Sequence, residues 1–438
     1  MHIVVVGAGL AGMRAAERLR AAGCDATLIE GGHRPGGRVR TVRDPFAGGQ
    51  YSESGAEWVD DIHHRMLELL DRHGVEVAAT GERWTVIRRW LYWNGELLGP
   101  DRIRDVEPGL AEQLDHFDMV VDAAAAGIDD PGRPHLHLAA TAIDGRSLAD
   151  VAEQTDLGML ARLMKRRDAQ GEFAAEPAQV SLLFVAQQRA YHRHHAAGRE
   201  VLAHRALGGF SQATDGMARD LGDISFGEML LEVEQDADGV QVRTSRRSIR
   251  ADHVVLACSL VPLRSVHFAT PMPDALAEAV HGLGYGTVTK TSVQWSTRDW
   301  PAGYATTSGV AQRVYEPTVD QPGEPGILMS YCGGQGGHEW ASLSESDRVA
   351  LAATEMRSMH SLQGEVLGGY SRAWSTEVRY GGSYAVYEPG QVTRYWDILR
   401  RPWGRVHLAG EHVADCTGYM EGALESGESV ARRILESD

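Results

Sequence analysis

Lysine is almost absent from this sequence. Of the 43 basic residues only two, Lys165 and Lys290, are lysines, and the others are arginines. Cysteine is also scarce: four residues lie far apart in the chain, in no spacing typical of metal ligands or of a disulfide framework. The histidine-rich stretch 192–195 lacks a metal-binding spacing as well, and we expect it on a solvated helix surface. These scarcities predict free thiols in a cytoplasmic protein and no metal site. Because lysine is so rare here, each of the two lysines is a candidate for a specific role.

Long apolar runs and an excess of positive charge are missing too. No window approaches the roughly 20 apolar residues of a membrane helix, and the apolar run at 3–6 leads into glycines rather than a signal-peptide cleavage site. The formal net charge of −17 argues against nucleic acid as a partner, because that affinity is supplied by clustered Lys and Arg. With 438 residues, 43% of them hydrophobic, the chain is long enough for two connected domains, and a homodimer stays open.

Glycine, in contrast, is plentiful and stands where a dinucleotide site requires it. The β-branched run at 3–6 predicts a buried strand, residues 11–20 predict a helix, and 26–29 predict the next strand. The G-x-G-x-x-G pattern at 7–12 lies between the first strand and the helix. This context, with an acidic residue ending the second strand, predicts a Rossmann-like dinucleotide site.

Each residue of this pattern has an expected task. Gly7 forms a tight turn, Gly9 admits a pyrophosphate, and Gly12 allows the helix to pack closely on the strand. The helix start, with Leu10 and Ala11, supplies partial positive charge. Glu30 is placed to accept hydrogen bonds from an adenosine ribose.

The residues that follow indicate FAD rather than NAD. Residues 30–38 continue into a loop in which Gly36, Gly37 and Arg38 can lay amides and a guanidinium against the pyrophosphate and the flavin. With Thr41, this loop resembles the E-x-x-x-R-x-G-G-R signature of the flavin-containing amine oxidase superfamily. That superfamily includes monoamine oxidases, polyamine oxidases and L-amino-acid oxidases.

The resemblance extends over most of the chain outside residues 100–200. Residues 208–210, a predicted hairpin at 229–244 and a predicted strand at 251–257 resemble the family's middle FAD segment. The resemblance implies that the backbone of Leu230 lies near the adenine.

The C-terminal part resembles the family's last FAD motif, in Gly410, Glu411 and residues 418–423. The resemblance implies that Glu411 binds near the ribityl or pyrophosphate group and that the Met420 amide meets the pyrimidine edge of the flavin. A helix starting near Tyr419 would aim its positive end at that edge, where reduced flavin is negative.

Lys290 lies in a predicted strand that resembles the family strand whose lysine holds a water against flavin N5. The resemblance implies a role in the reaction of reduced flavin with oxygen. The alternative is an ordinary lysine at a strand edge.

The stretch from Trp374 to the tyrosines of 379–384 resembles the family segment before the C-terminal motif. Covalent members carry a cysteine there that bonds the flavin, and this chain has Ser383, which implies non-covalent FAD. Tyr384 and Tyr419 match the two tyrosines of the family's aromatic cage, whose rings attract an amine substrate. The alternative is that both tyrosines only fill the core.

The loop at 55–60 departs from the L-amino-acid oxidases, since it lacks the arginine that grips a substrate carboxylate. It resembles the polyamine-oxidase version instead, with Asp60 at the acidic position. Asp60 could attract a substrate ammonium, and Glu57 could hydrogen-bond or deprotonate a substrate N–H. Either carboxylate could instead be a rim residue or half of a buried pair with arginine.

The fold class expected from these segments is α/β (α+β). It comprises a Rossmann-like FAD-binding domain interleaved with a substrate-binding domain of mixed sheet plus helices. We assign 1–78, 200–265 and 371–438 to the FAD-binding domain, and 79–199 and 266–370 to the substrate-binding domain with a helical insert. Strands bearing aromatics are expected over 80–110, followed by a mainly helical stretch over 111–207.

The function that this resemblance implies is an FAD-dependent oxidase acting on a C–N bond. Hydride transfer from a small-molecule amine or amide to flavin N5 would give an imine, and reoxidation by O2 would give H2O2. One alternative is a biosynthetic oxidase of secondary metabolism, such as antibiotic biosynthesis, whose imine product is captured by cyclisation. A further alternative is a non-catalytic flavin-binding scaffold.

Overall fold

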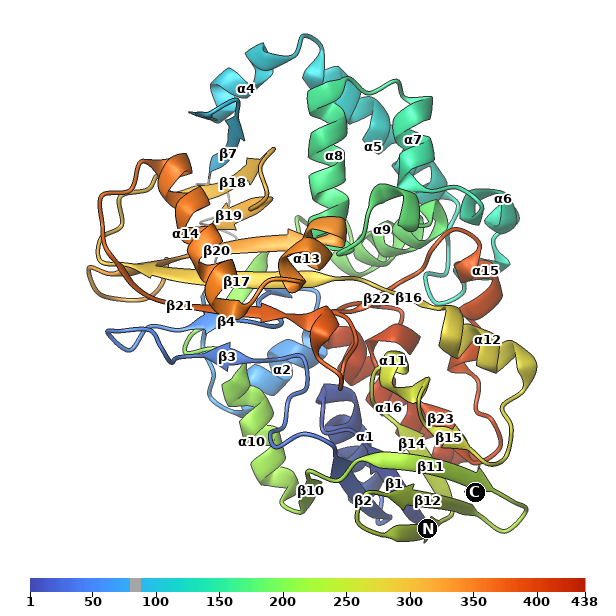
Figure 1. The fold of residues 1–438 in the computed structure, drawn as a ribbon. Coiled ribbons are helices and arrows are strands. Elements are labelled where there is room, and N and C mark those ends of the chain that lie inside the picture. Colours follow the sequence, from blue (N-terminus) through green and yellow to red (C-terminus); the bar gives the residue numbers. More distant parts are fainter. Residues whose placement is uncertain (79–87, 438) are drawn as a thin grey trace.

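The computed structural model describes residues 1–78 and 88–437 of the chain. It confirms the expected α/β class, with helices packed on several sheets (Figure 1). The aromatic residue Trp84, within the stretch expected to form strands, lies outside the described residues.

A five-stranded parallel sheet forms the lower half of the molecule in Figure 1. Its strands, in order across the sheet, are β10 (Ile224–Phe226), β2 (Asp25–Glu30), β1 (His2–Val6), β14 (His253–Leu256) and β23 (Val406–Leu408). Adjacent strands are parallel throughout. The strands come from widely separated parts of the sequence, so the sheet combines segments from the beginning, the middle and the end of the chain.

The central strand β1 is apolar at successive positions because both faces of the sheet are covered. Ile3 and Val5 pack in a core with helices α1 (Leu10–Ala21) and α16 (Met420–Glu436). Val4 and Val6 pack in the other core, which also contains residues of a four-stranded sheet. That sheet has the order β13 (Ser248–Ala251), β12 (Val240–Thr244), β11 (Leu230–Gln235) and β15 (His267–Phe268).

A seven-stranded sheet lies above the parallel one in Figure 1. Its order is β21 (Val366–Ala373), β17 (Val288–Trp295), β20 (Gly326–Gly333), β19 (Arg313–Tyr315), β18 (Gly303–Thr307), β7 (Arg88–Trp93) and β8 (Glu96–Leu98). Helices α13 (Gly334–Ala341) and α14 (Glu345–His360) pack on the strands β17 and β21. Every residue of β17 is buried, and this strand carries Lys290.

The Ala-rich stretch forms the expected helical insert. Its helices are α5 (Leu110–Ala126), α6 (Ala140–Asp144), α7 (Leu148–Gln154), α8 (Met159–Glu172) and α9 (Leu182–Ala196). The stretch ends in a strand, β9 (Ala203–Ala206), which pairs with β5 (Val59–Asp60) and β6 (Val77–Ala78).

One expectation for the region before the insert is wrong. Residues 100–106, expected among the strands, form the helix α4 (Pro100–Val106). Gly99 and Pro100 mark its start, since proline at the first helical position lacks only an N–H that would have no partner there. The expectation of strands rested on the aromatic residues of β7, and it did not take the helix start at Gly99 and Pro100 into account.

The remaining helices and strands are short connections around these layers. They are β3 (Thr41–Val42), β4 (Ser52–Glu53), α2 (His64–Arg72), α10 (Ser211–Leu221), α11 (Leu260–Leu263), α12 (Asp274–Gly282), β16 (Gly284–Tyr285), β22 (Ala385–Val386) and α15 (Gln391–Tyr395), with one-turn 3-10 helices at Pro134–Leu136, Pro177–Gln179, Trp374–Thr376, Ile398–Arg400 and Glu411–Val413. None of the described helices is long and apolar enough to cross a membrane.

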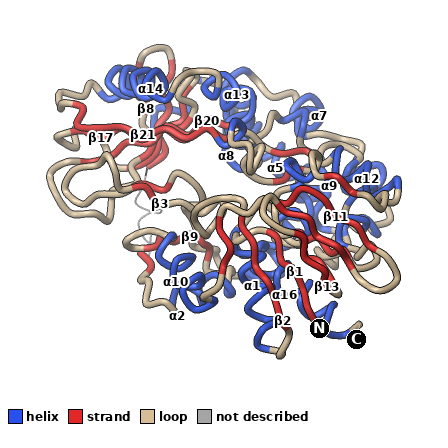
Figure 2. Tube along the Cα trace, turned by 60° about the horizontal axis from the view of Figure 1, so that its bottom comes forward, coloured by secondary structure: helices blue, strands red, loops and turns tan. Residues whose placement is uncertain are grey.

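Helices α1 and α16 pack against each other, and the N and C labels lie close together in Figure 2. The first and the last segments of the chain therefore meet beside the same parallel sheet. The division into an FAD-binding and a substrate-binding domain at the expected boundaries stays a prediction.

Candidate active site

A cavity of about 450 Å³ is lined by residues of both large sheets. Most of the site residues expected from the sequence lie on its wall. These are Gly7, Gly9, Leu10, Ala11, Glu30, Gly36, Gly37, Arg38, Leu230, Lys290, Trp374, Tyr384, Gly410, Glu411, Tyr419 and Met420. Gly12, Glu57 and Asp60 are not on the wall of this cavity.

The glycine turn after β1 has the geometry that its sequence pattern requires. Gly7 has a φ of +108°, which side chains rarely tolerate. A Cβ on Gly12 would lie 1.9 Å from the carbonyl oxygen of Gly7, so only glycine allows this approach. A Cβ on Gly9 would meet nothing within 4 Å, because Gly9 faces the cavity.

Two carboxylates organise the backbone around this cavity. Glu30 accepts hydrogen bonds from the amide of Ala8 at 2.8 Å and from that of Gly32 at 2.6 Å. Glu411 accepts a hydrogen bond from Arg38 at 2.7 Å and another from the Gly418 amide at 3.0 Å. The first carboxylate fixes the glycine turn, and the second ties the arginine loop to the C-terminal motif.

Helix starts aim unsatisfied donors at the same cavity. Neither Gly9, which precedes α1, nor Tyr419, which precedes α16, provides a side-chain cap to its helix. The first N–H groups of each helix are therefore available to an anion or a carbonyl group. The buried Ser259 also lies on the wall. These donors, with the open space before Gly9, fit the pyrophosphate and flavin of FAD.

Lys290 lies where the cavity meets the seven-stranded sheet, paired in register with Tyr331 on β20 and Arg372 on β21. Its Nζ donates to Glu57 Oε2 at 2.7 Å, to the Gly55 carbonyl at 3.0 Å and to the Glu53 carbonyl at 3.2 Å. Three acceptors match the three hydrogens of a lysine ammonium.

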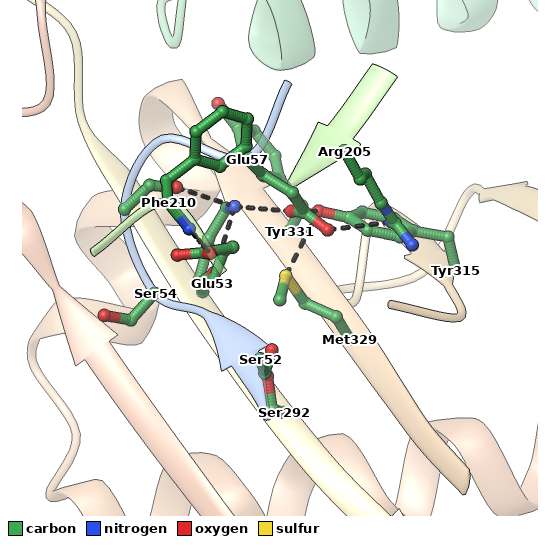
Figure 3. A network of polar contacts seen from close by, with 12 residues as sticks. Ser52, Glu53, Ser54, Glu57, Arg205, Phe210, Ser292, Tyr315, Met329 and Tyr331 are labelled. Atoms are coloured by element: carbon green, nitrogen blue, oxygen red, sulfur yellow. Dashed lines mark hydrogen bonds and ion pairs between the residues drawn. The ribbon is translucent and has the colours of Figure 1, made fainter. Parts of the chain in front are cut away.

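Glu57 is the centre of a buried polar cluster (Figure 3). Besides Lys290, it accepts from Arg205 Nη2 at 2.8 Å and from the Tyr315 hydroxyl at 2.6 Å. Burial alone would raise the pKa of Glu57, but the charges of Lys290 and Arg205 and the hydrogen bonds outweigh it, so the pKa lies below its ordinary value. Glu57 is therefore an ionised partner of Lys290 in the resting protein.

Arg205 joins this cluster to the loop that was compared with amino-acid oxidases. Its guanidinium lies over the Trp58 ring, 4.1 Å from the ring centroid, and also donates to the Glu316 carbonyl at 3.1 Å. An arginine thus does lie beside this loop, but it is held by Glu57 and Trp58. The expectation that Glu57 is half of a buried pair with arginine describes its contacts well.

Tyrosines form the wall around Lys290. Tyr331 and Tyr384 share a hydrogen bond of 2.9 Å between their hydroxyls, and both line the cavity with Tyr419. Burial raises the pKa of Tyr331 to about 12 and holds the pKa of Tyr384 well above its ordinary value, so both phenols stay neutral. Trp374 also lines the wall and donates to the Ser54 carbonyl at 2.8 Å.

Asp60 is not on the wall of the cavity, but it is near enough for its charge to act on Tyr419. Its amide donates to His63 Nδ1 at 2.9 Å, and the His63 ring lies 5.1 Å from the Tyr419 ring between centroids. Burial and the neighbouring Asp61 raise the pKa of Asp60 to about 6, and burial lowers the pKa of His63 to about 3. Asp60 is therefore a carboxyl that titrates near neutral pH beside one of the two cage tyrosines.

The histidine-rich stretch differs from its expected place at two positions. His194 is exposed as expected, but His192 and His195 are half-buried. The ring of His192 lies 6.4 Å from that of Tyr419 between centroids. Helix α9 turns this residue toward the site, which sequence periodicity does not reveal. No group of three or more His, Cys, Asp or Glu side chains that could hold a metal ion occurs among the described residues.

Ser383, the position at which covalent relatives were expected to have cysteine, lines the cavity and donates to the Gly286 carbonyl at 2.8 Å. Cys416 is buried elsewhere, with its Sγ 3.6 Å from His63 Nε2. Cys258 also lines the cavity, and burial raises the pKa of its thiol to about 12. A thiol held in its neutral form is a weak nucleophile.

Sequence analysis did not predict four residues of the site: Arg205, Tyr315, Tyr331 and Glu53. All four reach the Lys290 cluster through strand pairing or contacts between distant segments. Tyr331 had the best signal, because it lies in the short, mostly apolar run 326–333 that is typical of a buried strand, but nothing local sets it opposite Lys290.

Comparisons with known proteins agree over nearly the whole chain. Residues 10–435 match the family model described as flavin containing amine oxidoreductase. The chain is 25% identical over 460 residues to the probable flavin-containing monoamine oxidase A of Dictyostelium discoideum, which covers 99% of this chain and 97% of the relative. Its fold is similar to that of cyclohexylamine oxidase from Brevibacterium oxydans IH-35A, with a TM-score of 0.87, 22% identity, and coverage of 100% of this chain and 99% of that one. The structure of putrescine oxidase bound to putrescine gives a TM-score of 0.86 at 23% identity, with the same coverage.

Proposed function

Because this chain belongs to the flavin-containing amine oxidoreductase family, we propose that it is an FAD-dependent oxidase that converts a small amine to its imine and reduces O2 to H2O2. As a member of that family it is a flavin-dependent oxidoreductase, and a flavin-binding scaffold without chemistry is set aside. The substrate, the acceptor and the residue roles are proposals.

One observation supports this function most directly. Lys290, Tyr331, Tyr384 and Tyr419 line the same cavity whose other wall carries the glycine turn and Glu30. A dinucleotide cofactor bound along the glycine turn would therefore present its reactive end to a lysine and three tyrosines. Bound FAD supplies the redox chemistry, by accepting a hydride from the carbon next to nitrogen and passing two electrons to O2.

The residues of the chain have separate tasks in this proposal. Tyr384 and Tyr419 bind and orient the amine through their ring faces. Lys290 holds a proton at the reacting face, and Glu57 orients Lys290 rather than taking a proton from the substrate. This assignment for Glu57 follows from its lowered pKa and its three donors.

An amine without a carboxylate is the substrate class we propose. The arginine nearest to the loop, Arg205, is engaged by Glu57 and Trp58, so it offers no free clamp for an α-carboxylate. Asp60, beside Tyr419, provides negative charge that attracts a substrate ammonium. The relatives named above, a cyclohexylamine oxidase and a putrescine oxidase, act on amines of this kind.

We further propose that FAD is bound without a covalent bond, since Ser383 replaces the cysteine of covalent relatives. Denaturing the holoprotein in acid and separating the protein should leave all flavin in the supernatant. Flavin that stays with the protein would contradict this part of the proposal and direct attention to Cys258.

The test of the function is anaerobic mixing of the FAD-loaded protein with a panel of monoamines, diamines and L-amino acids. Loss of the oxidised flavin absorbance with an amine, followed by H2O2 on admission of air, is the expected result. Reduction by L-amino acids alone would overturn the substrate class, and reduction without H2O2 would overturn the oxidase. Slow reaction with every simple amine would instead favour the biosynthetic reading, in which the imine of a complex intermediate cyclises.

A further inference from the structure

A second, much smaller void lies beside the Lys290 cluster. Its volume is about 10 Å³, which is about the space that one water molecule occupies. Glu53, Glu57, Arg205, Tyr51 and Asp320 are among the residues that line it, and it shares no lining residue with the cofactor cavity. Glu57 therefore faces Lys290 through one oxygen and contributes to the wall of this void.

Glu53 Oε2 and Arg205 Nε, which belong to residues lining the void, are buried and have no hydrogen-bond partner among the described residues. The other oxygen of Glu53 is occupied, because it accepts from the Thr41 hydroxyl at 2.9 Å and from the Phe210 amide at 2.8 Å. Buried polar groups without partners are costly, and a water needs two to four polar neighbours to be held. The void has the size and the polar lining of a site for one ordered water.

One carboxyl beside the void has a pKa near neutral pH and can therefore exchange a proton. Lys290 and Arg205 are positive, and Glu57 is held ionised by both. Burial raises the pKa of Glu53 to about 7 against the opposing hydrogen bonds of Phe210 and Thr41, with Glu57 raising it further and Lys290 lowering it. Asp320 and Tyr51 complete the titratable groups on the wall. Glu53 is thus a carboxyl that can carry a proton near neutral pH.

We propose that Glu53 stores a proton behind Lys290 and returns it to the lysine through one water in this void and the carboxylate of Glu57. The inference rests on the proposed function, in which Lys290 gives up a proton at the reacting face as O2 is reduced to H2O2. Glu53 touches neither cofactor nor substrate, so it is a positioning residue that acts through Lys290.

The proton moves from Glu53 to Lys290 in three transfers. The O–H bond of Glu53 breaks as its proton passes to the water, and the water gives one of its own protons to the Glu57 carboxylate. Glu57 passes that proton to the neutral amine of Lys290, and an N–H bond forms. The sum is Glu53–COOH plus Lys290–NH2 giving Glu53–COO⁻ plus Lys290–NH3⁺, with the water and Glu57 unchanged. Reprotonation of Glu53 from solvent completes the cycle.

The variant that tests this step is Glu53→Gln. An amide keeps an acceptor for Thr41 and Phe210 but carries no exchangeable acidic proton. Glu425→Gln is the matched control, since burial also raises the pKa of Glu425 to about 7 and Glu425 has no contact with Lys290 in the described part of the chain.

The first readout is the infrared spectrum of the holoprotein between pH 5 and pH 9. We expect one protonated-carboxyl band that titrates near neutral pH to be lost in the Glu53→Gln variant and kept in the Glu425→Gln variant. An unchanged set of titrating bands in Glu53→Gln would overturn the proposal.

The second readout is the rate at which photoreduced enzyme is reoxidised by O2, which needs no amine. In the wild type this rate should fall about tenfold per pH unit above neutrality, as a single stored proton is lost. Glu53→Gln should lack this inflection and react at the slow rate throughout, while Glu425→Gln keeps it. An inflection that survives in Glu53→Gln would refute the relay.

These readouts separate two kinds of failure. If no amine reduces the flavin, the proposed function fails, whereas the infrared band and the photoreduced reaction still decide whether Glu53 supplies the proton. If amines do reduce the flavin but both readouts are the same in wild type and Glu53→Gln, only the relay is overturned.

Discussion

The Nζ of Lys290 lies 2.7 Å from Oε2 of Glu57, and the two side chains are only 6% and 2% exposed. Such a buried pair does not stabilise a fold strongly, because removing two charges from water costs about as much as their attraction returns. Removing one partner is different, since it leaves the other charge buried. The pair therefore holds Lys290 in place at the cavity wall, and several predictions depend on it.

Lys290→Met should slow the reaction of reduced flavin with O2 by about a hundredfold, because the positive charge at the reacting face is gone. The measurement is stopped-flow reoxidation of photoreduced enzyme. Lys165→Met is the matched control, because Lys165 is the other lysine of the chain. Its Nζ lies 2.7 Å from Asp118 Oδ2, and neither residue lines the cavity. Equal rates in both variants would remove Lys290 from the chemistry.

Glu57→Gln should lower the free energy of unfolding by about 3–5 kcal/mol, because Lys290 and Arg205 would both stay buried without their carboxylate. Urea unfolding of the apoprotein measures this change. The double variant Glu57→Gln/Lys290→Met should be less destabilised than the sum of the two single changes predicts. Strict additivity would mean that the two side chains do not interact in solution.

Gly9→Ala and Gly12→Ala should separate cofactor binding from folding. At Gly12 the new Cβ would lie 1.9 Å from the Gly7 carbonyl oxygen, so we expect a loss of about 1–3 kcal/mol in the stability of the apoprotein. At Gly9 the Cβ meets nothing within 4 Å, so the apoprotein should melt normally while flavin affinity falls at least about tenfold. Thermal melting and flavin fluorescence titration distinguish the two. A normal affinity in Gly9→Ala would place the cofactor elsewhere.

Tyr331→Phe should reduce kcat/KM for the preferred amine by about tenfold, because Tyr384 loses the hydrogen bond that fixes its ring and a buried hydroxyl is left unpaired. Steady-state kinetics over a range of amine concentrations tests this. Tyr92→Phe removes a hydroxyl from β7, where Tyr92 meets Ser358, and should leave kcat/KM unchanged. If both variants behave alike, the contact between Tyr331 and Tyr384 has no part in binding.

Glu53→Gln should gain stability relative to the wild type as the pH rises from 5 to 8. The folded pKa of Glu53 is about 7, above the ordinary value of 4.5. A folded state that binds the proton more tightly is favoured at low pH and loses this contribution as pH rises through about 7. The shift corresponds to a free energy on the order of 2–3 kcal/mol. Urea unfolding at both pH values measures it, and parallel changes in variant and wild type would show that Glu53 does not titrate there.

The parts of the site that sequence predicted are those whose chemistry is local. The turn from Gly7 to Gly12 and the acid at Glu30 have fixed spacings, because one strand, one turn and one helix place them. The C-terminal motif is local as well, and Glu411 and Met420 lie on the cavity wall as expected.

The parts that sequence did not predict depend on distant contacts. Arg205 meets Glu57 across 148 positions of the chain, and Tyr315 meets it across 258. No spacing rule connects such residues, since sheet register and helix packing bring them together. For the same reason Glu57 could be named as a candidate, while its partners could not.

The packing of α16 against α1 also sets an order of events during synthesis. The glycine turn is synthesised long before α16. Gly410, Glu411 and Met420 are needed to close the cavity, so a nascent chain that lacks them presents only half of the proposed cofactor site. Under this proposal the flavin is captured after assembly, and proteolytic loss of α16 should release the cofactor before the rest of the fold opens.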